Sequence, residues 1–369
     1  MSRIKFASGD RMFFMLVLVL VFAGLAIFSS ATLGLLAREN SSVSKDILLQ
    51  AGLGFGLGFL ALFFTRTISL ALMRRLAPYI YTVTLLFTAL VFVPDIGLTA
   101  HGATRWIDLG FTTVQPAEFL KIGFVLMLAW WLAPRARMLS DPKKGLFPFI
   151  LMLAFPSALL LAQPNTSTVF LLLATGAVMY FSAGAPWRDF GIIGLIVLVV
   201  LGIFILARPY VLERITTFID PRADALGSGY QIQQSLIAIG SGGLLGRGFG
   251  QSAEKFNYLP EPDGDSVFAV FAEETGFIGA LVLLAFFIAF AARGIVIAGR
   301  SPDLFGGLLA LGFSFIIIFQ TFINICAMLG IIPLTGLPLP FVSHGGTALM
   351  ATLLMCGFIL NVAAHRRSV

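Results

Sequence analysis

Long apolar runs recur along the whole chain, and short segments between them carry most of the charged residues. Ten runs approach or exceed the roughly 20 residues that an α-helix needs to cross a bilayer. The pattern therefore predicts an all-α polytopic membrane protein with about ten transmembrane helices, in which residues 1–369 form a single integral membrane domain. The predicted spans are residues 12–36, 47–65, 77–95, 115–133, 146–163, 166–184, 189–207, 266–292, 304–332 and 341–364.

Two segments between the predicted spans have features of their own. Only Gln163, Pro164 and Asn165 separate the fifth and sixth runs, which predicts a tight turn near a membrane face. Residues 208–265 form the one sizeable segment outside the runs, so we expect a large loop between the seventh and eighth helices. Within this loop Ile232, Leu236 and Ile239 have helical spacing, which predicts a short helix there.

Composition narrows the class of protein. Hydrophobic residues make up 58% of the 369 residues and charged residues 11%, against roughly 45–50% and about 25% in soluble domains. These values exclude a disordered protein, a coiled coil and a nucleic-acid-binding domain, so we expect no nucleic-acid partner. Both cysteines, Cys326 and Cys356, lie in apolar runs and are expected to be core residues. The first run is long and lacks a small-residue cleavage site, as in an uncleaved signal anchor.

The distribution of Lys and Arg predicts the orientation. Ten helices place both termini on one side of the membrane, and most of the basic residues fall in the loops on that side. The positive-inside rule then predicts cytoplasmic termini. The loop at 208–265 lies on the opposite side, and most acidic residues fall in the loops or at the helix ends of that same side.

Ionisable residues inside membrane spans are costly to bury and are therefore candidates for function. Glu118 and Lys121 lie near the outer start of the fourth span, and their spacing of three places them on one helix face, where they can pair. Two interpretations remain open at this point. The pair either fixes the helix as a structural ion pair or lines a cavity that opens outward.

A second candidate lies where the long loop enters the eighth span. Asp265 either caps that helix or acts as a general base, since Glu261 and Asp263 crowd the same stretch. Glu273 and Glu274 lie two turns deeper in the same span. For these two we expect buried ion pairs or hydrogen-bonded helix contacts, because neither carboxylate can face lipid.

Cations gather on the outer side. Arg105, beside Trp106, lies in a short outer loop, and Arg214 and Lys255 lie in the long one. Guanidinium groups suit phosphate recognition, although anchoring to lipid headgroups explains the same placement. The three histidines lie in separate segments, and the chain contains no phosphate-binding loop of the Gly-x-x-x-x-Gly-Lys type. No cofactor is predicted, and no ligand signature specifies a divalent cation, although one could accompany a pyrophosphate.

Four sequence blocks together resemble the SEDS proteins (shape, elongation, division and sporulation), the RodA and FtsW peptidoglycan polymerases. The first two are GATRWIDLG at 102–110 with QPAEFLK at 115–121, and DPRADALGSGYQ at 220–231 with QSLIAIGSGG at 234–243. The others are YLPE at 258–261 followed by Asp265 and EETG at 273–276, and PLTGLPLP at 333–340 with SHGG at 343–346. The resemblance covers essentially the whole chain and is slightly closer to FtsW than to RodA.

The resemblance implies a glycosyltransferase that polymerises lipid II and releases undecaprenyl pyrophosphate, in division or elongation. The family's essential aspartate falls on Asp265, and its polar pair on the fourth span falls on Glu118 and Lys121. These three are the predicted catalytic residues, with Asp265 as general base. Predicted substrate-binding residues lie in the same blocks and the long loop: Arg105, Trp106, Arg214, Gln231, Ser235, Lys255, Glu261 and Ser343.

The resemblance also implies a cellular location and a partner protein. It places the protein in the bacterial cytoplasmic membrane, in contact with membrane lipids, with an extracytoplasmic active site and a class B penicillin-binding protein, a single-span transpeptidase, as partner. This chain departs from many members at Asp263, where they have His, at Asn165, where they have Asp, and at His344, where they have Tyr. Asp263 thus leaves the identity of the base open between two carboxylates. The rival functions are a lipid II flippase and a membrane scaffold without catalysis.

Overall fold

The computed structural model describes residues 10–38, 50–100, 103–110, 112–207, 209–220 and 227–365. Within these ranges, the described part of each predicted apolar run falls largely in helix. The helices are α1 (Arg11–Arg38), η2 (Gln50–Leu57) continuing into α3 (Gly58–Thr67), α4 (Leu70–Ala89), α5 (Pro116–Leu132), α6 (Leu146–Ala162), α7 (Thr166–Ser182), α8 (Trp187–Ala207), α12 (Val267–Gly299), α13 (Leu304–Met328) and α14 (Gly346–Ala364).

Helix α4, which corresponds to the third predicted span, begins earlier than the hydropathy pattern predicts. It starts at Leu70 rather than near residue 77, because Ser69 caps it by accepting a hydrogen bond from the Leu72 N–H at 3.2 Å. Arg74 and Arg75 lie in its first turns and lower the local hydropathy without breaking the helix. The turn between α6 and α7 is as predicted, since Asn165 caps α7 through the Thr168 N–H.

Among the described residues, six helices are long and apolar enough to cross a bilayer, and further apolar helices are shorter. The longest, α12, has 33 residues, and α1, α4, α5, α13 and α14 complete the six. Together with the number of apolar segments, this length and hydropathy identify a multi-pass membrane protein.

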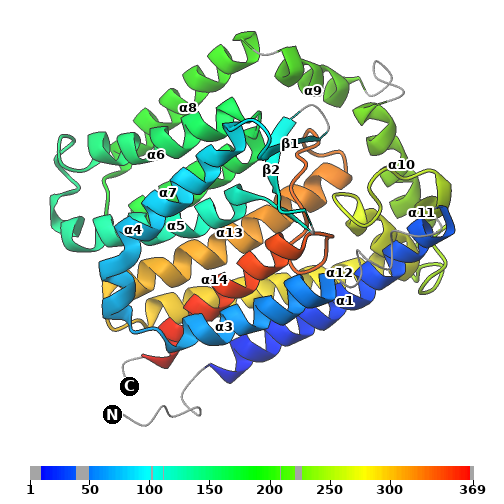
Figure 1. Cartoon of the computed structure of the whole chain (residues 1–369), viewed down its shortest axis with the longest axis horizontal. Helices are drawn as coiled ribbons and strands as arrows, with labels where there is room; N and C mark the ends of the chain where they lie inside the picture. The colour runs from blue at the N-terminus through cyan, green and yellow to red at the C-terminus, as the bar shows by residue number, and fades with distance from the viewer. Residues whose placement is uncertain are drawn as a thin grey trace.

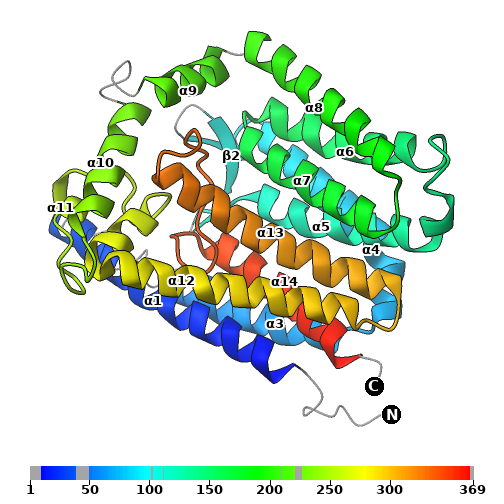
Figure 2. The same cartoon turned by 180° about the vertical axis from the view of Figure 1, so that it is seen from behind.

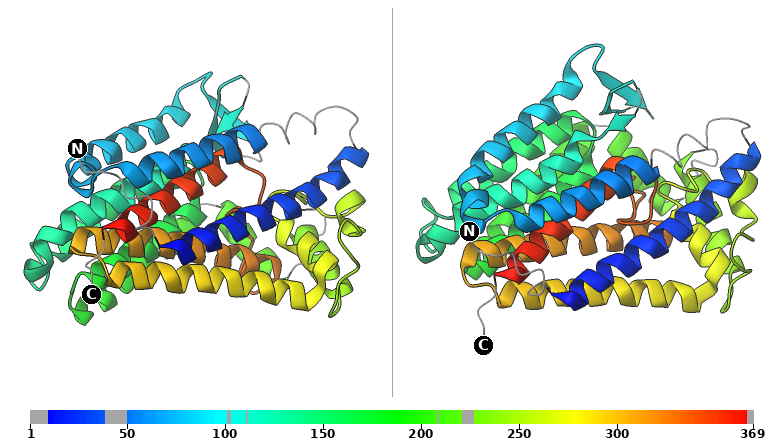
Figure 3. Two further views of the ribbon diagram at one scale, coloured as in Figure 1. Left: turned by 90° about the horizontal axis from the view of Figure 1, so that it is seen from below. Right: turned by 60° about the horizontal axis from the view of Figure 1, so that its bottom comes forward.

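The helices run lengthwise through the molecule, with α13 at its centre (Figures 1 and 2). This helix packs against α5, α7, α12 and α14, while α3 packs on α14 and α4 on α5. Helices α1 and α12 lie side by side along one flank, and α4 lies on the other (Figure 3). Helix α1 begins and α14 ends at the same end of the bundle (Figure 1), as the predicted even number of spans requires.

A small antiparallel sheet, which the apolar pattern does not predict, lies between α4 and α5. It follows the short η3 turn (Leu90–Phe92) and comprises β1 (Gly97–Ala100), β2 (Ala103–Asp108) and β3 (Thr113–Val114), in the order β1-β2-β3. Its strands are too short to produce a clear alternation in the sequence. The sheet positions Arg105 and Trp106, both on β2.

The described part of the long loop forms three helices. It contains α9 (Pro209–Ile219), α10 (Ser228–Ser241) and α11 (Glu254–Asn257). Helix α10 confirms the helix predicted from Ile232, Leu236 and Ile239, but of these three only Ile232 is fully buried. Helices α10 and α11 lie at the end of the bundle opposite the start of α1 (Figure 1).

Helix α12 is interrupted at Gly276, whose φ of 68° lies in the left-handed region that favours glycine. Neighbouring backbone groups pair instead with residues 243–248 of the loop. The N–H of Phe277 donates to the Gly243 carbonyl at 2.9 Å, and the N–H of Arg247 donates to the Glu273 carbonyl at 3.0 Å. A side chain at Gly276 would meet the Gly246 nitrogen at 2.3 Å, so the loop and helix can approach this closely only without one.

Candidate active site

Asp265 lies two residues before the start of α12 and is partly exposed. Ser266, the next residue, occupies the N-cap position of α12 and makes no capping hydrogen bond with its side chain. The turn that presents Asp265 is closed by Glu261, whose carbonyl accepts from the N–H groups of Gly264 at 3.1 Å and Ser266 at 3.2 Å. Glu261 itself is exposed, with a φ of 46°. These backbone hydrogen bonds help to determine where Asp265 lies.

Residues 329–345, which connect α13 to α14, form a loop that packs against this turn; we call it the 329–345 loop. Ser343 joins the two segments, since its hydroxyl accepts from the Leu339 N–H at 2.7 Å and donates to the Gly264 carbonyl at 2.7 Å. The backbone N–H of His344 donates to the Asp263 carbonyl at 2.6 Å. Ser343, predicted as substrate-binding, thus holds the backbone next to Asp265.

Glu118 and Lys121 form the predicted ion pair, with 2.7 Å between Lys121 Nζ and Glu118 Oε2. Glu118 is 3% and Lys121 1% exposed, so the pair does not line an open cavity. Lys121 also donates to Gln320 Oε1 on α13 at 2.8 Å. Two charges this deeply buried tolerate the loss of water only because each is neutralised by the other.

Two predicted residues of the long loop contact the same region. The guanidinium of Arg214, on α9, donates to the Leu334 carbonyl of the 329–345 loop at 2.9 Å. The side-chain amide of Gln231, on α10, donates to the Ser266 hydroxyl at 2.9 Å. Helices α9 and α10 are thereby attached to the segments around Asp265.

Arg105 and Trp106 lie apart from these contacts, on the sheet. Arg105 donates to the backbone carbonyls of Gln163, at 3.3 Å, and Pro164, which fastens β2 to the turn between α6 and α7. Trp106 pairs with Leu98 across the β1–β2 ladder. Beside them is a cavity of about 460 Å³, lined by Val91, Phe92, Val93, Pro94, Gly97, Thr99, Ala103, Thr104, Ala162, Gln163 and Pro164.

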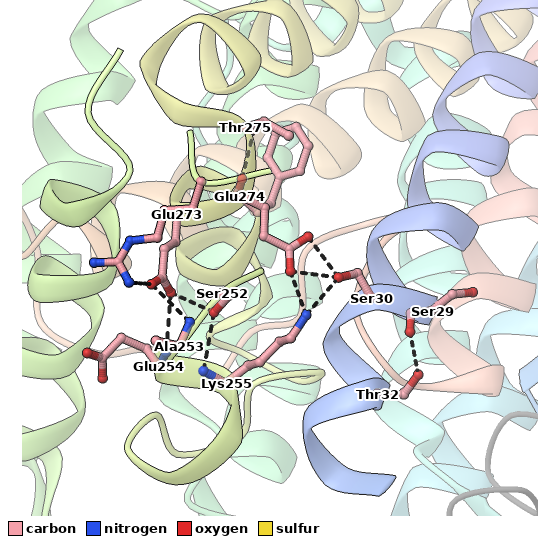
Figure 4. Close-up of polar contacts among 12 residues, drawn as sticks. Ser29, Ser30, Thr32, Ser252, Ala253, Glu254, Lys255, Glu273, Glu274 and Thr275 are labelled. Atoms are coloured by element: carbon pink, nitrogen blue, oxygen red, sulfur yellow. Dashed lines mark hydrogen bonds and ion pairs between the residues drawn. The ribbon is translucent and has the colours of Figure 1, made fainter. Parts of the chain in front are cut away.

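Two predicted substrate-binding residues are buried instead. Lys255 is 0% exposed, and its ammonium lies 2.6 Å from Glu274 and 3.0 Å from the Ser30 hydroxyl on α1 (Figure 4). Ser235 is also fully buried, and its hydroxyl faces the Met328 sulfur at 3.5 Å. Neither side chain presents a polar atom at the surface in this structure, so the structure gives no support for either as a substrate-binding residue.

The expectation for the two deeper glutamates is confirmed. Glu274 pairs with Lys255, and Glu273 lies 3.1 Å from the Arg247 guanidinium and accepts from the Ser252 hydroxyl at 2.5 Å (Figure 4). Nearby, burial raises the pKa of Glu254, the charge of Glu273 raises it further, and Arg247 opposes both. This cluster ties the long loop to α12 and α1.

Asp263 and His344 are two of the positions at which this chain differs from many members of the family that it resembles. Asp263 is buried, and its Oδ2 lies 3.6 Å from Nδ1 of His344. The imidazole ring also stacks on Phe28 of α1, with 5.8 Å between ring centroids. The two unusual residues therefore contact each other, beside Asp265. Within the described residues, no group of three or more His, Cys, Asp or Glu side chains could hold a metal ion.

Two polar residues of α13, which were not predicted as site residues, connect Asp265 with the Glu118–Lys121 pair. Gln320 contacts Lys121, and the side-chain amide of Asn324 donates to the Asp265 carbonyl at 2.9 Å. A spacing of four places both amides on one face of α13. Two amides with this spacing inside an otherwise apolar run are the sequence signal that would have identified them.

Comparison with known proteins covers the whole chain. A family model for cell cycle proteins, named for FtsW, RodA and SpoVE, matches residues 10–368. Stage V sporulation protein E of Bacillus subtilis (strain 168) is 36% identical over 98% of this chain and 99% of its own length. Peptidoglycan glycosyltransferase MrdB of Escherichia coli (strain K12) is 34% identical over 98% of this chain and 95% of its own length.

A solved structure agrees with the fold. It belongs to a study of how a peptidoglycan synthase complex coordinates polymerisation and crosslinking, and it superimposes with a TM-score of 0.78 at 31% identity. The match covers 97% of this chain and 98% of that one. The chain therefore belongs to the FtsW, RodA and SpoVE family of cell cycle proteins.

Proposed function

We propose that this protein is a peptidoglycan glycosyltransferase that polymerises lipid II on the extracytoplasmic face of the bacterial cytoplasmic membrane. The observation that carries the proposal is the hydrogen-bonded connection between Asp265 and the Glu118–Lys121 pair through α13. The names of the relatives support it, since MrdB is called a peptidoglycan glycosyltransferase and matches this chain over nearly its full length.

In the proposed reaction, the 4-hydroxyl of the acceptor sugar attacks the anomeric carbon of the donor. The new glycosidic bond forms as the bond to undecaprenyl pyrophosphate breaks, and a single displacement inverts the anomeric centre. Asp265 accepts the hydroxyl proton, because an alcohol is a weak nucleophile at neutral pH. Its partial exposure suits this role better than the burial of Asp263.

The leaving pyrophosphate gains negative charge, which cations in the site would stabilise. We assign this role to Arg105, Lys121 and Arg214. The Arg214 guanidinium is bonded to the 329–345 loop, which packs against the turn that carries Asp265, and the Arg105 guanidinium is bonded to the turn between α6 and α7. Lys121 and its partner Glu118 would act from a closed inner wall. Gln231, Ser343, Glu261 and Trp106 complete the proposed substrate-binding set around Asp265 and β2.

The proposed orientation follows the distribution of charge. Both termini lie in the cytoplasm, and the end of the bundle that carries α10, α11 and the 329–345 loop faces outward. A class B penicillin-binding protein is the proposed partner, by analogy with the peptidoglycan synthase complex whose polymerase this chain resembles.

The test is a polymerisation assay with labelled lipid II, using the purified full chain alone and together with the class B penicillin-binding protein of the same cell. We expect Asp265→Asn to lower polymerisation about 10²–10⁴-fold, the usual cost of losing a general base, while the variant folds and inserts normally. Asp263→Asn is the matched comparison. Normal polymerisation by Asp265→Asn with loss in Asp263→Asn would transfer the role to Asp263. Translocation without polymer would indicate a flippase, and neither activity would indicate a scaffold.

A further inference from the structure

Two buried amides lie between the predicted catalytic residues. Gln320 and Asn324 occupy successive turns of α13 on the same face and are 4% and 1% exposed. Side-chain amides are costly to bury unless their hydrogen bonds are satisfied. Their hydrogen-bond partners should therefore explain why two polar residues lie in the middle of an apolar helix.

Asn324 holds the backbone at Asp265. Its Nδ2 donates to the Asp265 carbonyl and to the Leu337 carbonyl of the 329–345 loop, both at 2.9 Å. Beside Leu337, a side chain placed at Gly336 would lie 3.5 Å from Asp265 Oδ2. The Asp265 carboxylate therefore lies near the same stretch of loop that Asn324 fastens.

Gln320 holds the other charged residue. Its Oε1 accepts from Lys121 Nζ at 2.8 Å, while its Nε2 donates to the Pro338 carbonyl at 2.8 Å. An ammonium can only donate and a carbonyl can only accept, so these partners fix the orientation of the amide. The two carbonyls that Asn324 and Gln320 bind in the loop belong to the adjacent residues Leu337 and Pro338.

We infer that Gln320 and Asn324 are positioning residues that set the geometry between Asp265 and Lys121. One amide anchors the segment that carries the proposed base, and the other anchors the buried cation. Both are fastened to a single rigid helix and to neighbouring carbonyls of one loop. The inference rests on the proposed function, in which these two charged groups serve the same reaction.

The chain provides a matched control. Asn361 on α14 is also fully buried, and its Nδ2 donates to the carbonyls of Thr65, Arg66 and Ile68, at 2.8, 2.9 and 2.5 Å. It fastens the connection between α3 and α4, at the end of the bundle away from Asp265 (Figure 1). In Asn324 and Asn361 alike the amide oxygen has no hydrogen-bond partner among the described residues, so this feature does not by itself mark a ligand.

The experiment compares Asn324→Ala with Asn361→Ala in the full-length protein. Initial rates of lipid II polymerisation are measured against substrate concentration and pH and divided by the folded fraction. Each variant loses buried hydrogen bonds, so we expect both to unfold at lower temperature. For Asn324→Ala we expect kcat to fall about 10–100-fold with KM nearly unchanged, because a misplacement of about 1 Å can cost roughly 10²-fold. The acid limb of its pH profile should also shift, whereas Asn361→Ala should retain the wild-type rate and profile.

A second pair of variants keeps the test decisive if Asn324→Ala does not fold. Gln320→Leu removes both contacts of the amide at similar volume, whereas Gln320→Glu retains an acceptor for Lys121. We expect Gln320→Glu to retain more of kcat than Gln320→Leu. Equal rates for these two, or equal losses of rate in Asn324→Ala and Asn361→Ala, would show a merely structural role and overturn the inference.

Asp265→Asn, assayed in parallel, separates the two levels of the proposal. If Asp265→Asn is inactive while Asn324→Ala and Gln320→Leu polymerise normally, the positioning role fails and the proposed function stands. If Asp265→Asn polymerises normally, the assignment of the base fails, and the positioning role fails with it. Loss of kcat in Asp265→Asn, Asn324→Ala and Gln320→Leu, with a normal rate in Asn361→Ala, supports both.

Discussion

At the scale of single residues, several buried charges in the described part of the chain are neutralised by nearby partners. Lys121 pairs with Glu118, Lys255 with Glu274, and Arg247 with Glu273. A buried charge without a partner is far more costly than the pair. Single substitutions in these pairs should therefore affect stability first, and their effects on activity need to be measured on the folded fraction.

The Glu118–Lys121 pair gives the first prediction at this scale. Lys121→Met or Glu118→Gln alone should destabilise the protein by about 3–5 kcal/mol, because each leaves a buried group uncompensated. The double variant should be no less stable than either single variant. Thermal unfolding of the four proteins in detergent measures the coupling, and strictly additive losses would contradict a paired role.

Glu254 gives a prediction about pH. Burial and the neighbouring charge of Glu273 raise the pKa of this loop carboxylate in the folded state. Ionised Glu254 therefore disfavours the folded state above the folded pKa, and this penalty disappears as the pH falls toward the unfolded value. Glu254→Gln should unfold at a higher temperature than wild type at pH 7, and the difference should shrink as the pH is lowered. A difference that grows on acidification would contradict the assignment.

At the scale of helices and loops, close backbone approaches hold the 329–345 loop in place. A side chain at Gly24 on α1 would lie 2.1 Å from the Phe341 carbonyl and 3.2 Å from Val342 Cα. Phe341 itself has a φ of 67° and contacts Phe290 of α12, with 5.8 Å between ring centroids. The loop that contacts Asp265 is thus enclosed by α1 and α12 as well as α13.

Gly24→Ala tests this enclosure. The added methyl group must displace either α1 or the loop, and overpacking of this kind typically costs about 1–3 kcal/mol. We expect lower thermal stability and reduced polymerisation per folded molecule. Gly194→Ala in α8 is the control, because nothing lies within 4 Å of a side chain at that position. Equal behaviour of the two variants would show that α1 does not constrain the loop.

At the scale of the whole molecule, the two ends of the bundle differ in chemistry. The end of the bundle where α1 begins and α14 ends also holds the start of α4 and the connection between α5 and α6 (Figure 1). These segments carry basic residues, including Arg74 on α4 and Arg135 and Lys143 in the connection. The other end carries α10, α11, the small sheet and the 329–345 loop (Figures 1 and 3). The positive-inside rule predicts that this second end faces outward.

Cysteine labelling tests that orientation. The test uses a background in which Cys326 and Cys356 are replaced by Ala. A membrane-impermeant maleimide is added to cells in which it can reach the outer face of an intact cytoplasmic membrane, and Leu245→Cys should react with it. Both Leu245 and Lys143 are exposed. Leu245 lies in the connection between α10 and α11 and Lys143 in the connection between α5 and α6, and these connections lie at opposite ends of the bundle (Figure 1). Lys143→Cys should therefore react only after the membrane is permeabilised. The reverse pattern would place the proposed active site in the cytoplasm.

Features that depend on neighbours along the chain could be predicted from the amino-acid sequence alone. Apolar runs of membrane length predicted where the helices lie, because hydropathy and length reflect the solvent around each segment. The turn at Gln163–Asn165 and the pairing of Glu118 with Lys121 also followed from local spacing, since three residues bring two side chains to one helix face. The start of α4 at Leu70 was missed, because two arginines lower the hydropathy of a segment that remains helical.

Contacts between residues far apart in the sequence became visible only in the folded protein. Lys255 looked like a substrate-binding cation in the sequence, but a hydroxyl 225 positions away on α1 and Glu274 on α12 enclose it. Asn324 and Gln320 showed in the sequence only as two amides four residues apart in an apolar run, which does not reveal that they connect Asp265 with Lys121, 199 positions from Gln320. Contacts across such separations depend on how helices pack, and spacing along the chain carries no information about that packing.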